Sequence, residues 1–137
     1  MMVYSLAIQT KNKQEIIDIT DKVQEAIKKS GIKQGTCIVF TPHTTAGILI
    51  NECTDKNLHQ DILNKLEQLI PTKSKYKHNC EDGGCNAHAH IKSSIIGASK
   101  IIFIENNKLL LGTWQRISYC EFDGPRQRKV HIKVLKD

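Results

Sequence analysis

The chain has 137 residues, a length that suits one domain, and its hydrophobic fraction of 39% and charged fraction of 25% are ordinary for a globular protein. No apolar run approaches the roughly 20 residues that span a bilayer, so no membrane partner is expected. The formal net charge is +6, but the lysines are scattered and are not interleaved with aromatic residues, so we expect a small anionic ligand and no nucleic acid.

The first half of the chain is rich in β-branched and apolar residues. These runs predict strands over residues 3–10, 15–19, 35–41 and 46–50. Thr20 is the expected N-cap of a helix over residues 21–30, which Gly31 ends. Only residues 42–45 separate the last two strands, so we expect a tight connection there.

The second half begins with the longest predicted helix, over residues 55–70, where apolar residues recur every four positions before Pro71. Residues 71–86 are polar and are predicted to form a loop, and loops of this length are often functional. A short helix over residues 87–96 and four strands follow, at 100–105, 108–112, 115–122 and 128–135. This order favours a compact α+β domain over residues 1–137, mainly antiparallel, with two to three helices.

The N-terminus and the cysteines bear on the cellular compartment. The first residues lack the basic and apolar regions of a signal peptide, so we expect a cytoplasmic protein. Structural disulfides among the five cysteines are not expected in that compartment.

The predicted loop and the start of the short helix gather residues that bind metals: His78, Cys80, Glu81, Asp82, Cys85, His88 and His90. Zinc takes imidazole, thiolate and carboxylate ligands. One interpretation is a zinc knuckle of Cys80, Cys85 and His88, and another is an open metal site that uses His78 and His90. A third is that the histidines only hydrogen-bond within the loop.

Helix geometry separates the two histidines of the short helix. Residues two apart point about 200° from each other, so His88 and His90 cannot both face one metal. His90, Ser93 and Ser94 share one stripe, and we expect Ile91 and Ile95 to face the core instead. The helix N-terminus offers N–H groups that suit a phosphate, so His90, Ser93 and Ser94 are the predicted site face.

Two further stretches carry candidate residues. In the first, His43 is a candidate ligand or acid–base group, and the hydroxyls of Thr44 and Thr45 can hold an anion. The alternative is an ordinary turn with a surface histidine. In the second, Glu121 is a candidate catalytic acid and Arg126 can fork onto a phosphate. The alternative there is an Asp-Gly-Pro hairpin with exposed arginines.

Together these stretches resemble the YjbQ-like family, also called the secondary thiamine-phosphate synthase family. The matching segments are Pro42–Ala46, Tyr76–His78, Ala89–Gly97, Leu111–Gln115 and Glu121–Arg126. Five ordered matches at the expected spacing are much more specific than any one of them.

The resemblance implies a homotrimer and a metal site built from histidines, for which His43, His78 and His90 are the candidate ligands. Zinc is the expected divalent metal, with magnesium as the alternative. The implied activity joins hydroxymethylpyrimidine diphosphate to thiazole phosphate and releases pyrophosphate, with His43, His90 and Glu121 as the expected catalytic residues. A metal-assisted hydrolase and a non-enzymatic metal- or ligand-binding trimer are the two rival interpretations.

Overall fold

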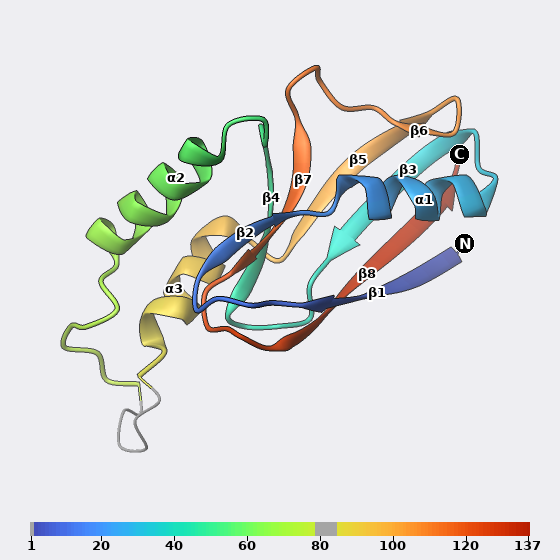
Figure 1. Ribbon diagram of the computed structural model, residues 1–137. Coiled ribbons are helices and arrows are strands. Elements are labelled where there is room, and N and C mark those ends of the chain that lie inside the picture. The colour runs from blue at the N-terminus through green and yellow to red at the C-terminus, as the bar shows by residue number, and fades with distance from the viewer. Residues whose placement is uncertain (1, 79–84) are drawn as a thin grey trace.

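The strands of the computed structural model, which describes residues 2–78 and 85–137, pair into two antiparallel sheets (Figure 1). Sheet A has the strand order β1-β8-β3-β5-β6, with β1 (Met2–Gln9), β8 (Gln127–Lys136), β3 (Gln34–Phe40), β5 (Ser99–Glu105) and β6 (Lys108–Leu109). Sheet B has the order β2-β7-β4, with β2 (Glu15–Asp18), β7 (Arg116–Glu121) and β4 (Ala46–Asn51). The expectation of an antiparallel α+β domain is confirmed.

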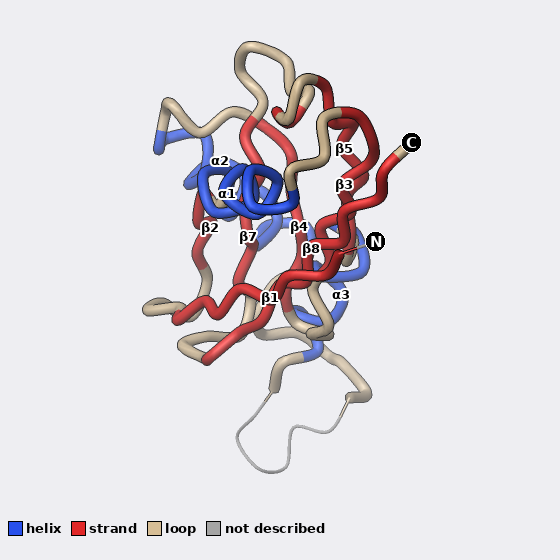
Figure 2. The backbone as a smooth tube through the Cα atoms, turned by 90° about the vertical axis from the view of Figure 1, so that its right-hand side faces the viewer, coloured by secondary structure: helices blue, strands red, loops and turns tan. Residues whose placement is uncertain are grey.

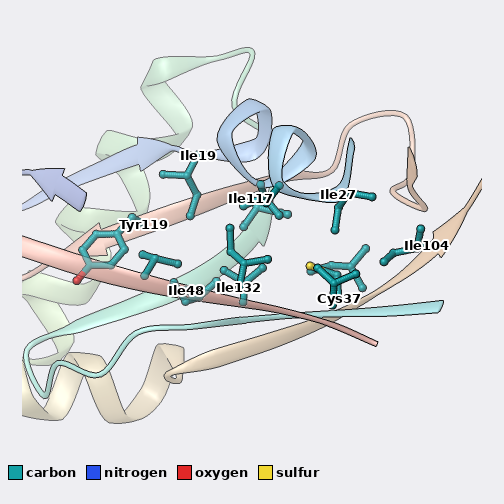
Figure 3. Close-up of a cluster of buried hydrophobic side chains, with 14 of the residues drawn as sticks. Ile19, Ile27, Cys37, Ile48, Ile104, Ile117, Tyr119 and Ile132 are labelled. Carbon is teal, nitrogen blue, oxygen red and sulfur yellow. The ribbon is translucent and has the colours of Figure 1, made fainter. Parts of the chain in front are cut away.

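The main core lies between the two sheets. Alternate residues of β8, such as Val130, Ile132 and Val134, are fully buried and meet Ile48 and Ile117 of sheet B (Figure 3). Helix α1 (Thr20–Ser30) adds an apolar face to the same core. Each fully buried aliphatic side chain contributes roughly 1.5–3 kcal/mol of hydrophobic stabilisation.

A second, smaller core covers the opposite face of sheet B. Helices α2 (Lys56–Leu69) and α3 (Ala87–Ile96) pack there, and Leu66, Ala89 and Phe122 are buried in the contact. Sheet B is therefore the middle layer, with sheet A on one side and two helices on the other (Figure 1). In Figure 2 the strands of sheet B, β2, β7 and β4, lie beside β8, β3 and β5 of sheet A. None of the described helices is long and apolar enough to cross a membrane.

The outer face of sheet A is left uncovered by the described part of the chain. Phe40 is 40% exposed there, and Ile101 and Phe103 are 65% and 64% exposed on neighbouring β5. Large apolar side chains gathered on one sheet face typically mark a contact surface.

Three local expectations need correction. The predicted N-cap Thr20 is the first residue of α1, and the carboxylate of Asp18 accepts its N–H at 2.9 Å and its hydroxyl at 2.6 Å. The strand expected over residues 108–112 ends at Leu109, because Gly112 donates its N–H to the Gln115 side chain within a loop. Cys85 is disulfide-bonded, contrary to the expectation of no structural disulfide.

Helix α3 faces the core with a different side from the predicted one. Ile91 and Ile95 are 39% and 62% exposed, whereas His88 and Lys92 are fully buried. The reason is the close approach of α3 to β4: a Cβ atom on Gly47 would lie 2.8 Å from Ile96 Cγ2. Ile96 makes this contact and the small Ala89 is fully buried on the packed side of α3, whereas Ile91 and Ile95 are left outside.

Three of the connections that lead from one sheet to the other lie together at one end of the molecule, and we call them the crossovers. They are residues 10–14 between β1 and β2, residues 41–45 between β3 and β4, and residues 122–126 between β7 and β8. The last is therefore a crossover and not the hairpin considered as an alternative, because β7 pairs with β2 and β4 while β8 pairs with β1 and β3. Two of the stretches singled out from the sequence are thus crossovers between the sheets.

Candidate functional site

The three crossovers are hydrogen-bonded to one another. Arg126 donates its N–H to the Thr10 hydroxyl at 2.8 Å, and Thr10 donates its N–H to the Arg126 carbonyl at 3.0 Å. Phe122 donates its N–H to the Thr45 carbonyl at 3.1 Å, which joins the second crossover to the third. Backbone groups of the crossovers, which lie outside the sheet ladders, find their hydrogen-bond partners in this way. Residues more than 100 positions apart in the sequence are thereby held side by side.

An open hollow of about 310 Å³ lies where these crossovers meet the N-terminal end of α3, and we call it the crossover hollow. Its lining residues come from two crossovers, from α3 and from β8: Pro42, His43, Thr44, Thr45, Asn86, His90, Asp123, Arg126 and Arg128. Of the predicted site residues, His43, Thr44, Thr45, His90 and Arg126 therefore share one hollow.

The hydrogen bond of His43 fixes the proton on its ring. Its Nε2 accepts the backbone N–H of Lys129 at 3.0 Å. In the neutral ring the proton must then be on Nδ1, which is available as a donor. Burial, followed by the charge of Arg128, lowers the pKa of His43 below its usual value. The ring is thus a neutral donor near pH 7.

Glu121 lies beneath the crossover hollow and does not line it. Its side chain is 0% exposed and each carboxylate oxygen has two donors. Oε1 accepts from the Thr10 hydroxyl at 2.7 Å and from Arg128 Nε at 2.9 Å, while Oε2 accepts from the Asp123 N–H and from Arg128 Nη2. Both oxygens are therefore engaged within the protein, and the catalytic role expected for Glu121 stays a prediction.

Arg128 links that carboxylate to the wall of the hollow. The guanidinium is 4% exposed, and its Nη2 also donates to the Thr45 hydroxyl at 2.8 Å. Pairing with Glu121 holds the pKa of Arg128 above its usual value although burial opposes this. We name Thr10, Thr45, Glu121 and Arg128 the strand cluster.

Arg126 is held by Asp123. Its Nε donates to the Asp123 carbonyl at 2.8 Å and its Nη2 to the Asp123 carboxylate at 3.0 Å. Asp123 also accepts from Lys13 and Asn86, and although burial opposes it, these donors lower the pKa of Asp123 to about 2. Arg126 is 53% exposed, so the pairing with Asp123 aims a solvent-accessible cation at the hollow.

The two predicted serines of α3 donate their hydroxyls to backbone carbonyls. Ser93 donates to the Ala46 carbonyl at 2.5 Å and ties α3 to β4. Ser94 donates to the His90 carbonyl at 2.8 Å. Neither serine lines the crossover hollow, and their predicted contact with a phosphate stays a prediction.

A second group of buried charges joins α2 to α3. The ammonium of Lys92, whose side chain is 0% exposed, lies 2.7 Å from the Glu67 carboxylate and 3.3 Å from Oε1 of the Gln14 side chain. It lies 2.9 Å from His88 Nδ1, and the buried His88 Nε2 has no partner among the described residues. We name Gln14, Glu67, His88 and Lys92 the helix cluster.

The expected three-histidine metal site is not assembled within the described residues. The rings of His78 and His90 are neighbours, with centroids 4.9 Å apart, but no three His, Cys, Asp or Glu side chains there are close enough to hold one ion. His43 lines the crossover hollow with His90, but its Nε2 is engaged by the Lys129 N–H. The zinc knuckle lacks a free thiolate at Cys85, and Cys80, Glu81 and Asp82 lie outside the described residues. A divalent ion therefore stays a prediction.

The geometry of the crossover hollow suits an anion. Two cations, Arg126 and Arg128, and one carboxylate, Asp123, line it, and each of these charges is paired within the protein. Neutral His43 and the Thr44 hydroxyl also line the hollow and add donors. Guanidinium groups offer paired N–H donors that match phosphate oxygens.

Sequence reasoning missed Arg128, Asp123 and Asn86 in this site. Arg128 stands two residues after Arg126, and the period of a strand places it on the inward face of β8 with Val130 and Ile132. A charged residue in phase with buried residues was therefore the available signal. No signal in the sequence pointed to Asn86, because its contact with Asp123 joins segments 37 residues apart.

The chain is similar to known proteins over nearly its whole length. The profile of the family described as "UPF0047 protein YjbQ-like" matches residues 4–137. The UPF0047 protein of Methanocaldococcus jannaschii is 44% identical over 99% of this chain and 96% of its own, and YugU of Bacillus subtilis is 42% identical over 98% and 99%.

Solved structures agree with these sequence matches. A crystal structure of an uncharacterized conserved protein from Clostridium acetobutylicum has a TM-score of 0.89 and 49% identity, covering 98% of this chain and 100% of that one. A hypothetical protein of Aeropyrum pernix has a TM-score of 0.94 and 38% identity, with 100% of both chains covered.

Proposed function

Because this chain belongs to the YjbQ-like UPF0047 family, we propose that it is a phosphate-handling transferase with the weak thiamine-phosphate synthase activity that its motifs imply. The reaction joins hydroxymethylpyrimidine diphosphate to thiazole phosphate and releases pyrophosphate. The supporting observation is the crossover hollow, where His43, His90, Arg126 and Arg128 line one space although they come from distant segments.

The reaction makes a specific demand on the protein. A ring nitrogen of the thiazole forms a bond to the methylene carbon of the pyrimidine, and the bond from that carbon to the diphosphate oxygen breaks with both electrons on the oxygen. Positive groups at that oxygen therefore favour departure of the pyrophosphate. Arg126, which is 53% exposed, can supply this charge, Arg128 adds to it from behind the wall, and His43 can donate a hydrogen bond from Nδ1.

A divalent ion would add Lewis-acid charge at the leaving oxygens. His78 and His90 are near enough to share an ion as two of its ligands, and the described part of one subunit offers no third. We therefore assign no step to the ion. Metal analysis of the purified protein, with zinc and magnesium both measured, tests this part of the proposal separately.

Assembly into a homotrimer is part of the same proposal. Phe40, Ile101 and Phe103 expose apolar surface on sheet A, and such surface is stabilised when a second copy covers it. Light scattering on the purified protein should give three times the 15.5 kDa mass of the chain. A single-chain mass at micromolar concentration would contradict the trimer.

The activity is tested with the two thiamine precursors and product detection by liquid chromatography and mass spectrometry. We expect thiamine phosphate and pyrophosphate in equal amounts, and a loss of at least about tenfold in turnover for Arg126→Ala. Trp114→Ala, which removes an exposed side chain outside the hollow, is the matched control. Absence of both products from folded protein, with and without added zinc or magnesium, would overturn the proposal.

A further inference from the structure

A second hollow, of about 320 Å³, adjoins the crossover hollow at His90. It is lined by a short stretch that follows α2 and by the first half of α3: Tyr76, Lys77, His78, Ala87, His90 and Ile91. We call it the ring hollow, because three of its lining side chains are rings. Of the described residues, only His90 lines both hollows, so they lie on either side of its side chain.

The walls of the ring hollow suit a flat apolar group. The rings of His78 and His90 meet edge to face, with centroids 4.9 Å apart and planes at 73°. Ile91, which is 39% exposed, and the buried Ala87 add aliphatic surface. Flat rings pack against such walls by stacking or edge-to-face contact, which a hydrated sugar does not match.

Tyr76 is held in place before any ligand arrives. Its hydroxyl donates to the Pro71 carbonyl at 2.5 Å, and its N–H donates to the Ser74 carbonyl at 3.0 Å. A ring held in this way loses little conformational freedom when a ligand packs on it. The hollow on the other side of His43, of about 520 Å³, has no aromatic side chain besides His43 in its lining. It is therefore the poorer place for a ring.

We propose that the ring hollow binds the planar ring of a ligand whose phosphate or diphosphate occupies the crossover hollow, with Tyr76 as the residue that selects for the ring. This rests on the proposed anion site and adds to it a specificity: phosphate esters of planar ring compounds over phosphate esters of sugars or short alkyl chains. The linker between ring and phosphate passes His90.

Two probes that differ only in the ring separate this inference from the proposed function. Benzyl phosphate and ethyl phosphate carry the same charged group, and their affinities for the whole protein are measured by calorimetry. We expect benzyl phosphate to bind at least about tenfold more tightly. Equal affinities would overturn the ring inference and leave the anion site standing, whereas binding of neither probe would overturn both.

Variants locate the ring. Tyr76→Ala should reduce the preference for benzyl phosphate to less than about threefold with ethyl phosphate affinity unchanged, and Tyr76→Phe, which keeps the ring but not the bond to Pro71, should retain it. Arg126→Ala should weaken both probes equally. Trp114→Ala is the control for loss of an exposed aromatic side chain. If folded Tyr76→Ala keeps the full preference, the ring binds elsewhere and the inference is wrong.

Discussion

The strand cluster and the helix cluster both bury charge, yet only the strand cluster lies beside the crossover hollow. In the strand cluster both charged side chains are buried, Glu121 at 0% and Arg128 at 4% exposure. In the helix cluster Lys92 is buried at 0%, but its partner Glu67 is 41% exposed. A buried charge therefore does not by itself mark a site.

The two clusters hold different parts of the molecule. The strand cluster joins all three crossovers, so it fixes the wall that carries Thr45 and the backbone contact of His43. The helix cluster joins α2, α3 and the first crossover through Lys92. We expect the first to matter for both stability and ligand binding, and the second for stability alone.

The largest expected effect is in the strand cluster. Arg128→Ala leaves the Glu121 carboxylate buried without its counter-charge, and breaking a buried pair in this way costs roughly 3–5 kcal/mol in free energy of unfolding. Urea denaturation measures the loss, with Lys108→Ala, an exposed cation, as control. The double variant with Glu121→Leu and Arg128→Met should lose less than Arg128→Ala. A larger loss in the double variant would show that the pair itself stabilises the fold.

A smaller loss is expected in the helix cluster. Lys92→Met removes the ammonium, but Glu67 is 41% exposed and can be solvated by water. We expect a loss of about 1–3 kcal/mol, chiefly from the unpaired groups left around position 92. Phosphate affinity should not change. If Lys92→Met costs as much as Arg128→Ala, the distinction between the two clusters fails.

Acid should weaken both regions through carboxylates of low pKa. The pKa values of Asp123 and Glu67 are about 2 in the folded protein, below the roughly 3.9 and 4.3 of the unfolded chain. Their stabilisation is therefore complete above about pH 5 and is lost as the pH falls toward 2. Asp123→Asn should therefore make the free energy of unfolding depend less on pH in this range, by up to about 1.4 kcal/mol per pH unit.

The matching variant at Glu67 calibrates that measurement. Glu67→Gln should flatten the slope less than Asp123→Asn, because the exposed Glu67 carboxylate is screened by water. Urea denaturation at several pH values gives both slopes. Equal flattening by the two variants would contradict the difference in burial.

The smallest effect on stability is expected at Arg126. Arg126→Lys keeps the charge beside Asp123, which retains Lys13 and Asn86, so the free energy of unfolding should change by less than about 1 kcal/mol. Affinity for phosphate should nevertheless fall about tenfold, since an ammonium lacks the guanidinium fork. Calorimetry with inorganic phosphate checks this, and unchanged affinity would leave Arg126 with only its contact to Asp123.

Local signals in the sequence predicted the helices and several residues of the crossover hollow. Periodic apolar residues and turn chemistry located the helices, and the clustering of His43, Thr45 and Arg126 in polar stretches led to residues that do meet in one hollow. Each of these signals involves residues that are only a few positions apart in the sequence. Only the resemblance to a family predicted that these distant stretches lie close together in the fold.

Long-range pairing explains what was missed. The Asp-Gly-Pro turn has the same local chemistry in a hairpin and in a crossover, and only the partners of β7 and β8 decide between them. The buried face of α3 was mistaken because periodicity favoured Ile91 over Lys92. Lys92 is buried because Glu67 lies opposite it, and nothing near residue 92 in the sequence announces that partner.

Gly47 has a consequence for how the chain can change in length. A side chain there would strike Ile96, so the contact between β4 and α3 sets the spacing of His43 and His90. That contact is made by Ile96, the last residue of α3, at the opposite end of the helix from the segment that joins it to α2. We therefore expect changes of length between His78 and Asn86 to be tolerated in diverging copies of this chain while His43 and His90 keep their spacing, whereas Gly47→Val would push the two walls apart.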